Sequence, residues 1–108
     1  MNKEEWEEAY KNLNEAYREL SIQERDYKNG SNKKIREKAG KEMDYVKHRL
    51  TYLFKKYPEV YIMATGGEEA SETHRIYIAD ELFNKRYIIG DIGNLLVSMD
   101  TKIKSFDT

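Results

Sequence analysis

Apolar residues recur at alternating steps of four and three near the start of the chain, and this heptad pattern constrains the fold more than any other feature. Such spacing keeps side chains on one face of an α-helix. The pattern has one polar member, Glu24, and its other members are Trp6, Tyr10, Leu13, Tyr17, Leu20 and Tyr27. Asn2 and Glu5 have the spacing of a capping box, and Asn29-Gly30 is a typical helix end. The sequence therefore predicts a helix over residues 2–29.

A second pattern of the same kind follows after a short turn. Ser31 can cap its helix, and Pro58 ends it because proline disfavours helical geometry in the residue before it. Its members are Ile35, Ala39, Met43, Val46, Leu50, Leu53 and Tyr57. Two helices of similar length, with matching apolar faces and a short turn, predict an antiparallel helical hairpin over residues 1–57. Glu24 is then expected close to Arg36 or Lys38.

The second half of the chain, residues 58–108, changes character and favours short strands. Residues 60–63 and 75–79 are apolar or alternating runs bounded by turn residues, and residues 86–89 are a candidate third strand. We therefore expect a strand-rich half that contains a small antiparallel sheet of two or three strands.

The end of the chain returns to a helical pattern, with Asp91 as its cap. The apolar residues on one face of this expected amphipathic helix are Ile92, Leu95, Leu96, Met99, Ile103 and Phe106. A strand at residues 95–99 stays an alternative, because short apolar runs fit either structure. The predicted fold class is therefore α+β, with the helical hairpin, the sheet and the C-terminal helix in a single domain over residues 1–108.

Composition indicates a folded protein. Charged residues make up 36% of the 108, but the net charge is only −1 and aromatic residues reach 12%, whereas disordered chains combine high net charge with few aromatics. The absence of cysteine excludes disulfide frameworks, thiolate metal sites and cysteine nucleophiles. Neither a signal peptide nor an apolar run of membrane-spanning length is recognisable, so we expect a cytoplasmic location.

The most organised polar feature is a row of basic and tyrosine residues on the second predicted helix. Residues 31–57 carry nine Lys or Arg and three Asp or Glu. At helical spacing, one sector without acidic residues contains Lys34, Lys38, Lys41, Tyr45, Arg49, Tyr52 and Lys56. Tyrosines with cations suit a protein partner, and they also suit the phosphates and bases of nucleic acid. In a purely structural alternative, the tyrosines widen the apolar face while the lysines cover them.

The remaining candidate features have simpler explanations. The acidic face of the first helix (Glu4, Glu8, Glu15, Glu19 and Asp26) resembles the faces of DNA mimics, but a solvated outer face is the simpler explanation, and Lys3 and Lys11 lie nearby and dilute its charge. Thr65-Gly66-Gly67 could hold an anion, yet no Gly-Lys-Ser/Thr follows and a plain turn suffices. The carboxylates of residues 68–72, with His74, match no established metal motif. His48 and His74 have no recognisable catalytic partner.

These observations predict a small non-catalytic binding protein that acts through protein–protein interaction. Its composition, rich in Lys, Asn, Ile and Tyr, favours an AT-rich genome and hence a phage or prophage regulator, inhibitor or adaptor. The alternative is a nucleic-acid-binding or nucleotide-binding protein that uses the same basic row; a pI near 6.2 argues against it. We expect no cofactor and no metal. The apolar faces exceed what one hairpin can bury, so a homodimer is a further hypothesis.

Overall fold

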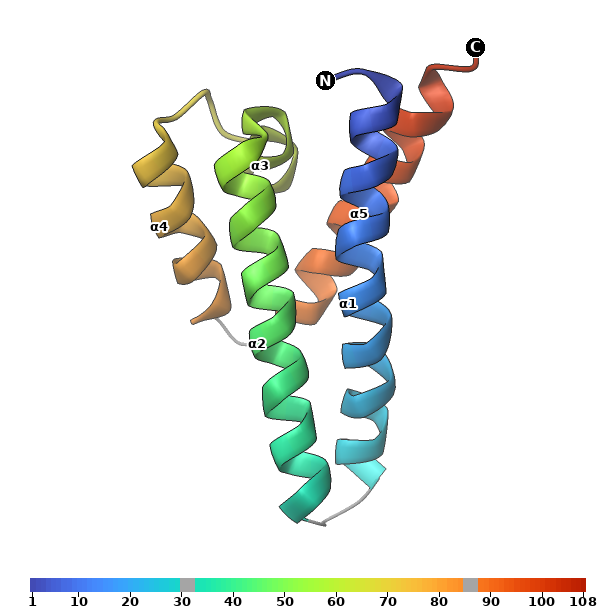
Figure 1. Cartoon of the computed structure of the whole chain (residues 1–108), viewed down its shortest axis with the longest axis vertical. Helices are drawn as coiled ribbons and strands as arrows, with labels where there is room; N and C mark the ends of the chain where they lie inside the picture. The colour runs from blue at the N-terminus through green and yellow to red at the C-terminus, as the bar shows by residue number, and fades with distance from the viewer. Residues whose placement is uncertain (30–32, 85–87) are drawn as a thin grey trace.

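The computed structural model describes the backbone of residues 1–29, 33–84 and 88–108, and the side chains of residues 1–22, 41–84 and 90–108. The described segments form helices α1 (Lys3–Asn29), α2 (Lys33–Lys56), α3 (Pro58–Thr65), α4 (Glu72–Phe83) and α5 (Ile88–Ser105), shown in Figure 1. They contain no strand, so the predicted α+β class and its sheet are wrong and the architecture is helical.

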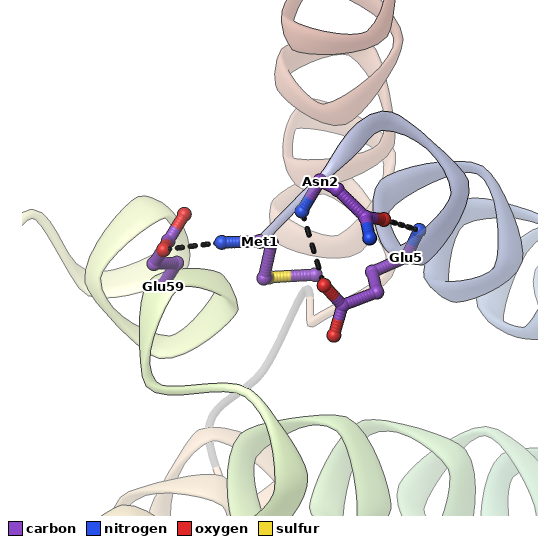
Figure 2. A network of polar contacts seen from close by, with 4 residues as sticks. All are labelled: Met1, Asn2, Glu5 and Glu59. Carbon is purple, nitrogen blue, oxygen red and sulfur yellow. Dashed lines mark hydrogen bonds and ion pairs between the residues drawn. The ribbon is translucent and has the colours of Figure 1, made fainter.

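The antiparallel hairpin of α1 and α2 is confirmed, and it is the longest feature of the molecule (Figure 1). The capping box is present: the main-chain N–H of Glu5 donates to Asn2 Oδ1 at 2.8 Å, and the N–H of Asn2 donates to Glu5 Oε1 at 3.0 Å. The N-terminal amino group pairs with Glu59 of α3 at 2.7 Å, which links the start of α1 to that helix (Figure 2). The expected approach of Glu24 to Arg36 or Lys38 lies outside the described side chains.

The strand predicted at residues 60–63 is wrong, because these residues belong to α3. Pro58 stands in the first turn, where its missing N–H costs nothing. Gly66 ends the helix at a φ of +67°, and its N–H donates to the carbonyl oxygen of Ile62 at 2.8 Å. An apolar run between Pro and Gly therefore has the boundary signals of a short helix, and these outweigh its strand-like composition.

The strand predicted at residues 75–79 is also wrong, because it forms part of α4. Ser71 caps this helix, with its hydroxyl accepting the N–H of His74 at 3.2 Å. Arg75 and Ala79 are its buried residues. Their spacing of four matches one face of a helix, whereas a strand would have buried every second residue.

The C-terminal amphipathic helix is confirmed as α5, which excludes the strand alternative for residues 95–99. The helix already begins at Ile88, so Asp91 lies in its first turn and is not its cap. Of the third predicted strand, residues 86–87 lie outside the described residues, and the other two residues open α5. The predicted apolar face is buried at Ile92, Leu95, Leu96 and Met99.

The three shorter helices all lie on one side of the hairpin or at its edges. α4 packs against α2, α5 packs against α1, and α3 contacts α2, α4 and α5. Buried residues from all five helices form one cluster. In Figure 1, α5 passes behind α1, and α4 lies at the outer edge of α2. None of the helices that the structure describes lies over the side of α1 and α2 opposite α3 and α5, and we call this side the front face (Figure 1).

Candidate protein-docking face

The described members of the basic and tyrosine set predicted on the second helix lie along the front face of α2, because Tyr52 lines a small cavity with Glu8 of α1 and the others follow it at helical spacing. Lys34 and Lys38 are outside the described side chains. The other five, which we call the basic row, are Lys41, Tyr45, Arg49, Tyr52 and Lys56. The tyrosine side chains are 41% and 46% exposed, far more than the tyrosines that pack in the core. They are therefore available to solvent instead of extending the apolar face against other helices.

Each exposed tyrosine in the basic row is paired with a cation one turn later. The Arg49 guanidinium lies 4.8 Å from the centroid of the Tyr45 ring and donates a hydrogen bond to its hydroxyl. Lys56 Nζ lies 5.6 Å from the Tyr52 centroid and donates to its hydroxyl at 3.2 Å. The same spacing of four repeats after seven residues, so both pairs project from one side of α2. Cations within about 6 Å of a ring restrain its orientation.

The ammonium group of Lys56 is also held by a second ring, because it lies 5.2 Å from the centroid of Tyr57. The pKa of Lys56 is raised above its ordinary value of 10.5. The larger cause is hydrogen bonding to Tyr52, and the next is hydrogen bonding to Tyr57. The end of the basic row therefore keeps its positive charge throughout the physiological pH range.

A row of carboxylates runs beside the basic row on α1. Glu8 lines a small cavity together with Tyr52 and Leu53, which places Glu8 and Tyr52 on the same side of the hairpin. Glu15 and Glu19 follow Glu8 by seven and eleven residues, close to two and three helical turns, and all three are exposed. We call Glu8, Glu15 and Glu19 the acidic row. The front face thus carries opposite charges on neighbouring helices.

The levels of the two rows follow from the antiparallel arrangement. Seven residues forward from Glu8 lead to Glu15, and seven residues back from Tyr52 lead to Tyr45, so these two lie at one level. By the same reasoning, Glu19 lies level with Lys41. Each carboxylate of the acidic row therefore has a member of the basic row beside it on the neighbouring helix.

A groove of about 490 Å³ lies on the opposite side, between α4 and α5. Its floor comes from α2 and α3. It is lined by Leu50, Met63, Ala64, Thr65, Ile78, Leu82, Asp91, Ile92, Asn94, Leu95 and Ser98. Among the described residues of this lining, Asp91 is the ionisable one.

The loop between α3 and α4 holds the Thr-Gly-Gly segment and the carboxylates that were considered from the sequence. Thr65 Oγ1 donates to the carbonyl oxygen of Tyr61 at 2.8 Å and accepts the N–H of Gly67 at 3.2 Å, which makes the Thr-Gly-Gly segment a helix end and turn. Among the side chains that the structure describes, no three His, Asp or Glu residues gather closely enough to hold a metal ion. His74 is exposed, and the centroid of its ring lies 6.4 Å from that of Tyr61 and 6.3 Å from that of Tyr77.

Arg75 is an important polar residue that sequence reasoning missed. It is only 8% exposed and donates hydrogen bonds to three main-chain carbonyl oxygens. Its role is structural, since these bonds join α4 to the end of α2. The sequence did contain a signal for this buried arginine. Arg75 is a single charged residue at the start of an apolar run, and it stands four residues before Ala79, on the same face of a helix.

Comparisons of the chain with known proteins matched no family model, no curated protein and no solved structure. Among the described helices, none combines the length and the apolar character that crossing a bilayer requires.

Proposed function

We propose that this chain is a small non-catalytic binding protein that docks a protein partner on its front face, and so acts as a regulator, inhibitor or adaptor. The observation that carries the proposal is the pair of exposed tyrosines, Tyr45 and Tyr52, each held by a cation of the next turn. Tyrosine and arginine are enriched among residues that dominate binding energy. A ring that is already restrained loses less conformational entropy when a partner covers it.

The charges of the front face define the kind of surface that it fits. Because the acidic row stands beside the basic row, a complementary partner must also present both signs of charge in neighbouring rows. Such complementarity orients a complex and rejects wrong partners more than it increases affinity. A folded protein or an amphipathic helix can meet this requirement with its side chains.

The same arrangement weighs against the nucleic-acid alternative. Phosphates that approached Arg49 and Lys56 would also approach Glu8 and Glu15, one helix away. The repulsion would offset much of the attraction, whereas nucleic-acid sites are dominated by uncompensated positive charge. The two functions differ in one measurable property, since binding to a polyanion weakens steeply as salt rises.

The test of the proposal removes the tyrosines without altering the core. The double variant Tyr45→Ala/Tyr52→Ala and the unaltered protein are each used to capture partners from nuclease-treated lysate of the source cell. The matched control is Tyr77→Ala, which removes a tyrosine that is 57% exposed on α4, away from the front face. Because all three side chains are exposed, we expect changes in unfolding free energy within about 1 kcal/mol.

We expect a defined protein to be retained by the unaltered chain and by the Tyr77 variant, and to be lost by the double variant. Equal retention by all three proteins would contradict docking through the front face. Material that is recovered only without nuclease, and whose binding falls steeply with salt, would assign the basic row to nucleic acid instead.

A further inference from the structure

The front face is complementary to itself. One helix carries the acidic row (Glu8, Glu15 and Glu19) and its antiparallel neighbour carries the basic row at the same levels. We infer that the partner of this face is a second copy of the same chain, joined about a two-fold axis that runs parallel to the hairpin. This inference rests on the proposed function, because it names the protein that docks there.

The symmetry determines which rows meet. A half-turn about an axis parallel to the helices brings α2 of one copy over α1 of the other and leaves every residue at its original level. Glu8 of one copy then faces Tyr52 and Lys56 of the other, and each such contact occurs twice. The four hairpin helices form a bundle in which every neighbour is antiparallel, the commonest arrangement of short-looped bundles.

The charges select this axis over the other two-fold arrangement that brings the two faces together. An axis perpendicular to the helices would stack α1 on α1 and α2 on α2. The acidic rows of the two copies would then face each other, and Arg49 and Lys56 of one copy would face the basic row of the other. Like charges placed together across an interface disfavour it strongly. The parallel axis instead places the acidic row of each copy against the basic row of the other, and it brings Tyr45 and Tyr52 of both copies into the interface.

The area available is sufficient for a specific but modest dimer. The stretch of α1 with described side chains, residues 3–22, is about 30 Å long at a rise of ~1.5 Å per residue. Two adjacent helices cover a width of about 20 Å, so each copy contributes roughly 600 Å². The total of about 1,200 Å² is at the lower limit for specific protein interfaces. We therefore expect association in the micromolar range that weakens as salt is added.

The experiment uses two complementary charge reversals. One variant carries Lys41→Glu, Arg49→Glu and Lys56→Glu, so that both of its rows are acidic. The other carries Glu8→Lys, Glu15→Lys and Glu19→Lys, so that both rows are basic. Sedimentation velocity and native mass spectrometry over a range of micromolar concentrations measure the oligomeric state of each variant alone and of the equimolar mixture.

We expect the unaltered chain to dimerise, each variant alone to remain monomeric, and the mixture to form a dimer with one copy of each variant. A control that carries Lys55→Glu, Lys102→Glu and Lys104→Glu has the same net charge as the first variant, but Lys55 lies on the side of α2 that faces Glu72 of α4, and Lys102 and Lys104 lie on α5. It should dimerise like the unaltered protein. Far-UV circular dichroism and melting temperature check that every variant is folded.

Three results would overturn the inference: an unaltered chain that stays monomeric at every concentration, single variants that dimerise as well as the unaltered chain, or a mixture that stays monomeric. The proposed function is judged separately. Suppose that the unaltered chain is monomeric, but that capture of another protein is lost in the Tyr45→Ala/Tyr52→Ala variant. The front face then binds a different protein, and only the identity of its partner was wrong. If the unaltered chain is monomeric and the Tyr45→Ala/Tyr52→Ala variant also captures the same proteins as the unaltered chain, both proposals are wrong.

Discussion

Arg75 Nε in α4 donates a hydrogen bond of 2.6 Å to the main-chain carbonyl oxygen of Phe54 in α2. The same guanidinium also donates to the carbonyl oxygen of Lys55 at 2.9 Å and to that of Ala70 at 2.6 Å. The last carbonyls of a helix have no partner within it and carry partial negative charge. A cation buried at the end of α2 therefore satisfies these groups and attaches α4 to the hairpin.

Replacing Arg75 by Met should lower the free energy of unfolding by about 2–4 kcal/mol, because methionine keeps an unbranched side chain but leaves the buried carbonyls without a donor. Urea denaturation measures the change. Arg18→Met, at an exposed position on α1, is the control and should stay within about 0.5 kcal/mol. A loss of less than about 1 kcal/mol for the Arg75 variant would mean that water replaces the guanidinium at these carbonyls.

Replacing Gly66 by Ala should destabilise the protein by about 1 kcal/mol. Gly66 has a φ of +67°, a conformation in which a Cβ atom crowds the backbone although no other atom lies within 4 Å. Gly67→Ala is the neighbouring control, since Gly67 has no such φ and its added Cβ would stand 3.2 Å from the terminal oxygen of Thr65. Thermal melting compares the two. An equal or smaller effect at Gly66 would argue against the left-handed end of α3.

Two glycines of α5 should respond oppositely to alanine. A Cβ at Gly90 would meet nothing within 4 Å, so Gly90→Ala should stabilise the helix by about 0.5–1 kcal/mol. A Cβ at Gly93 would stand 2.9 Å from the Tyr17 hydroxyl, so Gly93→Ala should gain less or destabilise. In a Tyr17→Phe background this obstacle is absent and Gly93→Ala should recover the gain. Additive effects in the double-mutant cycle would contradict the close approach of α1 and α5.

The ion pair between Lys47 of α2 and Asp80 of α4, at 2.7 Å, should make stability depend on alkaline pH. Hydrogen bonding to Asp80, together with its charge, raises the pKa of Lys47 above the ordinary value of 10.5. A lysine whose pKa is higher in the folded protein than in the unfolded chain contributes stability to the fold. This stability is fully present below the pKa of the unfolded state and is lost as pH rises through the pKa of the folded state.

Asp80→Asn should therefore melt at a lower temperature than the unaltered protein near pH 9, and this difference should fade as pH rises above the ordinary lysine value of 10.5. The effect is small because both side chains are partly exposed. Glu81→Gln, an exposed carboxylate on the same helix, is the control. A difference between Asp80→Asn and the unaltered chain that persisted at high pH would show that Asp80 acts through something other than the charge of Lys47.

Sequence patterns predicted the helices correctly where the patterns extended over many residues. The heptad patterns predicted the hairpin because many successive turns repeat the same signal, and the spacing of Asn2 and Glu5 predicted the hydrogen bonds that cap α1. The C-terminal helix was predicted for the same reason. At residues 60–63 and 75–79 the pattern covers only one or two helical turns. Short apolar runs with β-branched and aromatic residues fit either a helix or a strand, and the prediction of strands there was wrong.

The sequence by itself determined the two long amphipathic helices, their short connection and the basic row on one face of the second, because these depend on periodicity along a single segment. Only the tertiary structure decided that Arg75 would reach three carbonyl groups at the end of another helix. Only the tertiary structure placed the acidic row beside the basic row on a side of the hairpin that no described helix covers, since the level and the uncovered side of two antiparallel helices depend on where the remaining helices pack.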